Sequence, residues 1–198
     1  MAHLHELIAQ YYPQYHSIEH YPADMVAPIR KSSDEWGILG NMTKCPLTIN
    51  GVTFPSSEHI FHIMKFTDTA IRRELLSDPS AYSMKRFKSK RYSKAALERP
   101  DWASVMIDVM KYVLTVKYAQ SEMFRNTLHR TGSLFILEDE TARMRGKAAD
   151  SWGAIISEDG SEYVGPNLLG RLLMELRKNN GILEYHLPDG ITSFFDLK

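Results

Sequence analysis

Residues 100–118 place the strongest constraint on the fold of this chain of 198 residues. Large side chains recur in this segment at steps of three and four residues, which is the spacing of one face of an α-helix. An apolar face of this length needs cover from other elements, so the pattern predicts a helix that faces a hydrophobic core. The face consists of Trp102, Val105, Met106, Val109, Met110, Val113, Leu114 and Lys117.

Shorter segments with helical spacing predict further helices at 4–11, 69–76, 81–87, 121–128 and 167–178. Residues 55–58, Pro-Ser-Ser-Glu, have the pattern of a helix start with a serine N-cap, and this helix should run to about residue 66 or beyond. Asn50-Gly51 between two short apolar runs predicts a hairpin. The fold class that follows is mainly α, or α+β with a small β element, in a single compact domain.

The first 28 residues differ in composition from the rest, because they hold four of the eight histidines, His3, His5, His16 and His20, together with several tyrosines and prolines. Histidine-rich segments can bind metal, but these four lack a regular ligand spacing, so we expect no metal site. The favoured interpretation is an arm that packs tyrosines on the body, and a His-rich metalloprotein is the alternative. The expected organisation is an arm at 1–28, a domain at 29–182 and a C-terminal tail packing on it at 183–198.

Composition excludes several classes of protein. The chain has 43% hydrophobic residues and 24 basic against 24 acidic side chains, which argues against disorder and against a global field that attracts polyanions. The single cysteine, Cys45, excludes an internal disulfide and a cysteine-type zinc site. Without an apolar run long enough to span a bilayer, or a signal-peptide pattern, we expect a cytoplasmic protein with no membrane partner.

Glu58, His62 and Lys65 lie at positions i, i+4 and i+7 of the helix predicted after residue 55. At 3.6 residues per turn they share one face, which makes them a candidate acid–base set. From the spacing alone, a solvated face with an i,i+4 ion pair is the favoured alternative.

A second candidate is a basic run with interleaved aromatics, formed by Lys85, Arg86, Lys88, Lys90 and Arg91 around Phe87. Such a concentration of positive charge suits a phosphate or diphosphate, and a solvated helix end explains it equally well.

Glycine-centred turns form the third feature: Trp36-Gly37, Trp152-Gly153, and residues 165–170, which lead into a helix. The last turn has the geometry to present backbone N–H groups to an anion, although it lacks the spacing of a nucleotide-binding loop. The two tryptophans are either core residues or walls that stack on a nucleobase, and core packing is the default.

Taken in chain order, these segments resemble the YbiA/NADAR family of N-glycosidases. The resemblance covers about residues 29 to 178 and is most specific in the Ser-Glu-His helix at 55–66 and in the Asn-Leu-Leu-Gly helix at 165–177. The other matching stretches are 33–37 with Asn41, 49–51, 102–118 and 152–153.

The resemblance implies a compact, mainly helical fold and an enzyme that cleaves the bond between a ribose C1′ and a nitrogenous base without a cofactor. In the family, the ribose belongs to a phosphorylated early riboflavin-pathway intermediate or to ADP-ribose attached to guanine in nucleic acid. The basic run favours the second kind of substrate, and a nucleic-acid partner held by Lys85, Arg86, Lys88, Lys90 and Arg91, because such substrates carry more charge.

The resemblance also assigns roles to residues. Glu58 is expected to stabilise the ribose cation and activate water, and Lys65 to protonate the leaving base or to form an imine at C1′. His62 is expected to orient the substrate and Arg86 to face its phosphate. The base and ribose pocket is expected to consist of Trp36, Gly37, Asn41, Trp152, Gly153, Asn167 and Gly170.

The chain departs from the family pattern inside this expected pocket. Residues 39–42 are Leu-Gly-Asn-Met in place of a Phe-Ser-Asn-Phe turn, His62 replaces a glutamine, and Lys85 replaces a glycine. Ala149 stands where the family has an acidic residue, with Asp150 one place later. These departures keep open a rival function, a non-catalytic module that binds ADP-ribose or a nucleotide.

Overall fold

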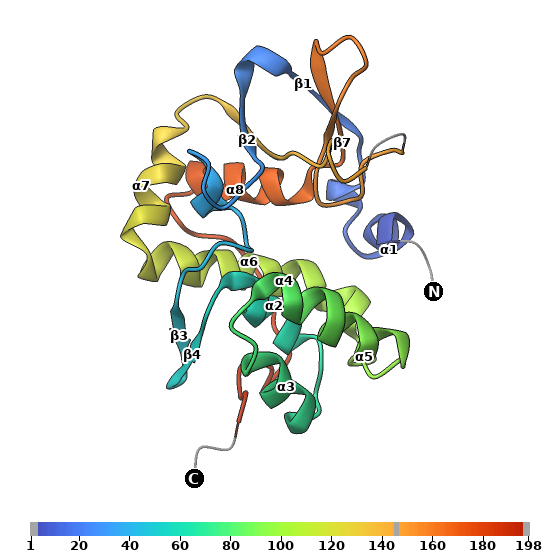
Figure 1. Cartoon of the computed structure of the whole chain (residues 1–198), viewed down its shortest axis with the longest axis vertical. Coiled ribbons are helices and arrows are strands. Elements are labelled where there is room, and N and C mark those ends of the chain that lie inside the picture. The colour runs from blue at the N-terminus through green and yellow to red at the C-terminus, as the bar shows by residue number, and fades with distance from the viewer. Residues whose placement is uncertain (1–3, 145–146, 196–198) are drawn as a thin grey trace. The chain divides into compact units, whose positions relative to one another are not determined.

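The computed structural model of the chain describes residues 4–144 and 147–195 (Figure 1). It divides into two compact units, one formed by residues 1–40 and 123–182 and the other by residues 41–122 and 183–198. We call them unit 1 and unit 2 and describe each by itself.

Unit 1 combines short strands with three helices. A three-stranded antiparallel sheet has the order β1-β7-β6, and a parallel pair is formed by β2 and β5. Single 3₁₀ turns occur at Pro13–Tyr15, Ala23–Met25 and Gly37–Leu39. The elements are α1 (Leu4–Tyr11), β1 (Glu19–Pro22), β2 (Val26–Ile29), α7 (Glu122–Arg130), β5 (Phe135–Glu138), β6 (Ile155–Ile156), β7 (Glu162–Gly165) and α8 (Leu168–Lys178).

Helix α8 packs directly against strand β5. Asn167 precedes the helix in the left-handed region, with φ 48° and ψ 44°, and its side chain bonds the backbone of β5 at Ile136 O (2.9 Å) and Glu138 N (3.2 Å). Gly170 lies so close to the strand that a Cβ atom there would stand 2.0 Å from Ile136 O. The helix and strand therefore depend on the absence of a side chain at Gly170.

Unit 2 is built around the long helix α6 (Trp102–Gln120), which packs against α2 (Ser57–Met64). A hairpin of β3 (Leu47–Ile49) and β4 (Val52–Phe54) precedes α2, with Asn50 and Gly51 at φ 48° and 79° in its turn. The remaining elements are α3 (Thr69–Leu76), α4 (Ala81–Ser83), a π-helix (Met84–Ser89) and α5 (Lys90–Lys94).

The fold class predicted from the sequence, mainly α with small β elements, is confirmed. The hairpin, the long helix and the helices at 4–11 and 69–76 form where they were expected. Two expectations are corrected. The helix that begins near residue 57 ends at Met64 rather than at residue 66 or beyond. The segment expected to be a helix at 81–87 is α-helical only at Ala81–Ser83 and continues as the π-helix from Met84.

The region predicted as an N-terminal arm contributes β1 and most of β2, which pair with β7 and β5. The C-terminal segment is held within unit 2, where Arg72 Nη1 donates to Ser193 O (3.0 Å) and Phe194 packs edge-on against Phe54. The domain boundaries at 28 and 182 stay predictions. Within residues 4–144 and 147–195, none of the helices has the length and apolar character needed to cross a membrane.

Replacing Gly170 by alanine should destabilise the chain by about 3 kcal/mol, because the added methyl group would overlap a backbone oxygen that cannot move aside. Urea unfolding measures the loss. Gly40→Ala is the matched control, since its Cβ would lie 3.0 Å from the Ile29 methyl group Cγ2 and at an ordinary contact distance of 3.4 Å from Gly37 O. Equal stability of the two variants would contradict the packing described here.

Candidate active site

Helix α2 places a carboxylate in its first turn. Ser56 caps the helix by accepting a hydrogen bond from His59 N (3.4 Å), and the Glu58 N–H donates to Asn41 O (3.1 Å). A negative side chain at this position is favoured by the free N–H groups and the dipole of the helix start. The local sequence Pro-Ser-Ser-Glu thus fixes both the start of the helix and the position of Glu58.

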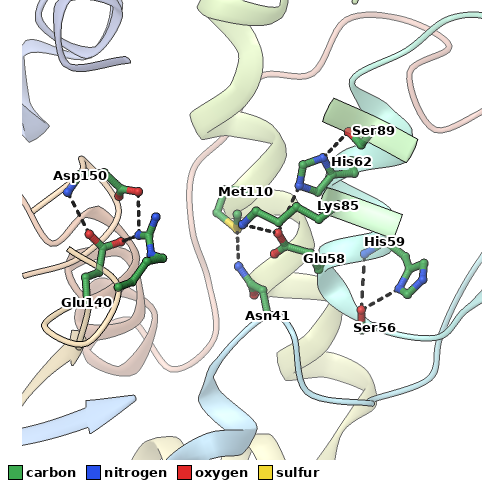
Figure 2. A network of polar contacts seen from close by, with 11 residues as sticks. Asn41, Ser56, Glu58, His59, His62, Lys85, Ser89, Met110, Glu140 and Asp150 are labelled. Carbon is green, nitrogen blue, oxygen red and sulfur yellow. Dashed lines mark hydrogen bonds and ion pairs between the residues drawn. The ribbon is translucent and has the colours of Figure 1, made fainter. Parts of the chain in front are cut away.

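The Glu58 carboxylate is buried and held by two side chains (Figure 2). The ammonium of Lys85 lies 2.8 Å from Oε1, and Nε2 of His62 lies 3.1 Å from the same oxygen. This arrangement joins Glu58 and His62 as the helical spacing predicts and adds an amine that the spacing did not identify.

Glu58 is ionised in this environment. Burial by itself would raise the pKa of its carboxyl group, but the positive charge of Lys85 and the hydrogen bond from His62 outweigh burial and hold the pKa well below the ordinary value. The site therefore contains a carboxylate at neutral pH in a place from which water is largely excluded.

His62 is neutral and its tautomer follows from its neighbours. Burial lowers the pKa of the imidazole, although Glu58 opposes the shift. Because an ionised carboxylate only accepts hydrogen bonds, Nε2 carries the proton, and Nδ1 accepts from Ser89 Oγ at 2.7 Å. Ser89 thereby fixes the ring so that it donates to Glu58.

The π-helix supplies two side chains that contact Glu58 and His62 of α2. Lys85 contacts Glu58 and Ser89 contacts His62, and the two residues are four apart in the segment Met84–Ser89. π-Helical turns are rare and occur frequently at functional sites. Sequence reasoning found the cations in this segment but neither the π-helix nor Ser89.

Lys65 has a different partner from the one that its helical position suggested. Its ammonium pairs with Glu98 at 2.6 Å and lies 5.9 Å from the centre of the Trp102 ring. The amine that contacts Glu58 is that of Lys85. The catalytic role predicted for Lys65 stays a prediction, and it requires the pair with Glu98 to open.

Asn41 is buried beside this cluster and carries an unsatisfied acceptor. Its Nδ2 donates to Met110 Sδ at 3.3 Å, whereas Oδ1 has no hydrogen-bond partner within the described part of the chain. Because an unpaired buried acceptor costs free energy, a donor from a ligand would be favoured at this point. The observation supports the predicted role of Asn41 in binding.

Lys117 is a fully buried lysine on α6, two turns beyond Met110. Burial lowers its pKa to about 8, while the charges of Cys45 and Glu58 oppose this shift. The sequence contains a signal for this group, because a lysine ends an otherwise apolar stripe, although helical spacing by itself assigns Lys117 only to the core face.

The basic run is partly neutralised within unit 2. Lys88 pairs with Asp78 at 3.3 Å, Arg91 with Glu74 at 2.9 Å, and Lys85 with Glu58. Arg86 is exposed and donates to the hydroxyl of Tyr82 at 2.6 Å. Lys90 is exposed as well. The predicted contacts of this run with phosphate and nucleic acid stay predictions.

Close packing in unit 1 leaves no room for a side chain at the glycines among the predicted site residues. A Cβ at Gly37 would lie 2.4 Å from Lys31 O, and one at Gly153 would lie 2.4 Å from Glu138 O. Gly170 and Asn167 join α8 to β5, as described above. Trp36 and Trp152 are half-buried, and the guanidinium of Arg130 lies 5.0 Å from the Trp36 ring centre. Their role in a pocket stays a prediction.

An acidic pair, the buried Glu140 and the half-buried Asp150, precedes Trp152 in unit 1. Glu140 accepts from Asp150 N at 2.9 Å (Figure 2). Arg143 contacts both carboxyl groups. Burial and the neighbouring Asp150 raise the pKa of Glu140. Asp150 Oδ1 in turn accepts from Trp152 N at 2.8 Å. Asp150 thus anchors the Trp152-Gly153 turn, although the position before it, 149, holds alanine.

The histidines of the first 28 residues have separate partners. The rings of His5 and His16 stack with centroids 4.2 Å apart, and His20 pairs with Glu162 at 3.0 Å. His3 lies outside the described residues. Among the residues that are described, no group of three or more His, Cys, Asp or Glu side chains has the geometry to hold a metal ion.

Comparison with known proteins assigns the chain to a family. The NADAR domain matches residues 28–179. This chain belongs to the NADAR family. It is 33% identical over 168 residues to the N-glycosidase YbiA of Escherichia coli strain K12, covering 83% of this chain and 94% of that protein.

The NADAR chain is also similar to a longer protein and to a protein whose structure has been solved. It is 29% identical over 160 residues to a riboflavin biosynthesis protein of Vibrio vulnificus, covering 81% of this chain but only 39% of the Vibrio protein. The solution structure of E. coli YbiA matches with a TM-score of 0.63 and 32% identity, over 84% of this chain and 92% of YbiA. The fold expected from the resemblance is confirmed by this match.

Lys117→Met should give a stability difference that depends on pH. Between about pH 8 and pH 10.5 the unfolded wild type binds more protons at Lys117 than the folded protein does, so wild-type stability rises with pH. The stability of Lys117→Met relative to wild type should therefore fall by about 2 kcal/mol between about pH 7 and pH 10. Urea unfolding at both pH values measures it. Lys111→Met on the same helix is the control, and equal pH slopes for Lys117→Met and wild type would contradict a buried ammonium.

Proposed function

We propose that this chain is an N-glycosidase that hydrolyses the bond between C1′ of a phosphorylated ribose and a nucleobase-like leaving group. The observation that carries the proposal is the ionised, buried carboxylate of Glu58, held by Lys85 and His62. Membership of the NADAR family and a relative named N-glycosidase support the reaction class, a hydrolase acting on N-glycosyl bonds.

The chemistry requires a fixed negative charge near C1′. As the bond to nitrogen breaks, positive charge develops on the ribose ring, and a carboxylate placed there beforehand stabilises it. The same carboxylate can take a proton from the attacking water, because it is ionised at neutral pH. Glu58 is suited to both tasks, because its carboxylate is buried, ionised and held by His62.

The other predicted site residues take supporting roles in this proposal. His62 orients Glu58 through Nε2–H and is itself held by Ser89. Lys65 protonates the leaving base or forms an imine with the opened ribose, and either step begins from its pair with Glu98. Asn41 offers its unpaired Oδ1 to the substrate, and Arg86 offers an exposed guanidinium to phosphate.

The identity of the substrate is a finer part of the proposal. The Vibrio relative is named for riboflavin biosynthesis, which supports a phosphorylated riboflavin intermediate. The cations at 85–91 support ADP-ribose linked to guanine in nucleic acid, because its diphosphate and flanking phosphates offer more charge to bind. We propose the ADP-ribosylated substrate as the preferred one.

Base release from ADP-ribosylated guanine in DNA should therefore exceed release from the phosphorylated riboflavin intermediate. Chromatography of the free bases, at equal concentrations of the two substrates, measures the ratio. A higher rate on the riboflavin intermediate would contradict the preference for ADP-ribose and leave the N-glycosidase reaction intact.

Glu58→Gln should lower the rate of base release by at least about 100-fold, because the amide is neutral and cannot stabilise the cation or accept a proton from water. Single-turnover assays measure the rate, and urea unfolding checks that the variant is folded. Glu74→Gln, which removes a surface carboxylate paired with Arg91, is the matched control and should leave turnover unchanged.

Two results would contradict this account in different ways. Unchanged turnover in Glu58→Gln would exclude the proposed role of the carboxylate. Absence of base release from every substrate, combined with calorimetric binding of ADP-ribose, would identify the chain as the non-catalytic binding module.

A further inference from the structure

The contact between Lys85 and Glu58 has an unusual combination of properties. Of the two side chains on Oε1, His62 is almost buried, with 10% of its side chain exposed, whereas half of the Lys85 side chain is exposed (50%). His62 is also tethered by Ser89 behind it. The Lys85 side chain is therefore the one of these two that can leave Glu58 without opening the core.

This ammonium opposes the reaction that the proposed function requires. An ammonium at 2.8 Å from Oε1 neutralises much of the negative charge that a cationic ribose would need. The attraction between Glu58 and a developing positive charge is strong only if Lys85 moves away. The structure without substrate thus shows the carboxylate in a state poorly suited to stabilising positive charge.

A phosphate group is the natural competitor for Lys85. A terminal phosphate carries about two negative charges, and a diphosphate linkage carries about one on each of its two phosphates. Either group therefore presents more negative charge and more acceptor oxygens to a flexible ammonium than a carboxylate does. Arg86, the next residue, is exposed and supplies a second cation on the same segment. A phosphorylated substrate can therefore draw Lys85 outward, whereas an unphosphorylated riboside offers nothing to replace Glu58.

The carboxylate keeps its charge when Lys85 leaves. The titratable and charged groups that face it are Lys85 from the π-helix, His62 from α2, and Lys117 from α6, with Lys65 acting on His62. His62 and the buried Lys117 remain in place and continue to favour the ionised form. Glu58 therefore stays ionised and loses only its contact with the ammonium of Lys85.

We propose that Lys85 is a specificity-determining residue that covers Glu58 until a phosphate of the substrate takes over its ammonium. This inference rests on the proposed function. The site would thereby restrict cleavage to phosphorylated ribosides.

A binding experiment tests the competition without any turnover. Calorimetry with ribose 5-phosphate is carried out on wild type, Glu58→Gln, Lys85→Met and the double variant. Removing the negative competitor should tighten binding in Glu58→Gln about fivefold, the equivalent of about 1 kcal/mol for a partly exposed ion pair. In the Lys85→Met background, Glu58→Gln should change the affinity little. Lys94→Met on α5 is the matched control and should bind as wild type does.

Unchanged or weaker binding of ribose 5-phosphate in Glu58→Gln would overturn the inference, and so would an equal tightening in the Lys85→Met background. Because this measurement needs no base release, it can fail while the N-glycosidase proposal holds, and it can succeed if that proposal fails.

Kinetics give the second measurement. Lys85→Met should lower kcat/KM on the phosphorylated substrate, because the variant lacks the ammonium that binds the phosphate. It should raise kcat on the same substrate after removal of its phosphate, because Glu58 is no longer covered by Lys85. Equal losses on both substrates would mean that Lys85 merely supports Glu58. A loss on the phosphorylated substrate without a gain on the other would mean that Lys85 is an ordinary phosphate ligand. Either result overturns the inference.

Discussion

The buried charge of Glu58 is the constraint on which the arrangement of unit 2 depends. Removing a carboxylate from water costs free energy unless cations and hydrogen-bond donors stabilise its charge. In this chain these partners come from separate elements. His62 belongs to α2, and Lys85 belongs to the π-helix. Lys117 on α6 adds a buried positive charge. The capped start of α2 fixes the backbone from which this carboxylate projects.

This arrangement explains how one short helix can combine core packing with a buried carboxylate. The apolar residues of α2 pack in the core, and Ile60 and Ile63 are fully buried. His59, which is buried as well, joins the helix start to the loop at residue 78 by bonding Ser56 Oγ (2.8 Å) and Asp78 O (2.8 Å). A rigid helix end of this kind holds the carboxylate in place, as preorganised electrostatic stabilisation of a cation requires.

The parts of the fold that follow local rules were predictable from the sequence. The stripe from Trp102 to Lys117 predicted α6, and Asn50-Gly51 predicted the hairpin, because these signals depend only on helical spacing and on the backbone freedom of the turn residues. Strands β1, β2, β5 and β7 were not predicted. They are short, and β1 pairs with a strand more than 100 residues away, so no local pattern specifies them.

The site was predictable in part for the same reason. Helical spacing correctly placed Glu58 and His62 together, but it says nothing about what faces them from other elements. The partner of Glu58 is Lys85, from a π-helix without a recognisable sequence pattern, while Lys65 on the expected face pairs with Glu98.

The environment of Glu58 should keep it a stable anion when no substrate is bound. Selective ¹³C labelling of glutamate and NMR titration of the Glu58 side chain measure its protonation state. We expect a carboxylate signal throughout about pH 4 to 8. A titration midpoint above the ordinary glutamate pKa of about 4.3 would show that the carboxylate is not stabilised by its neighbours.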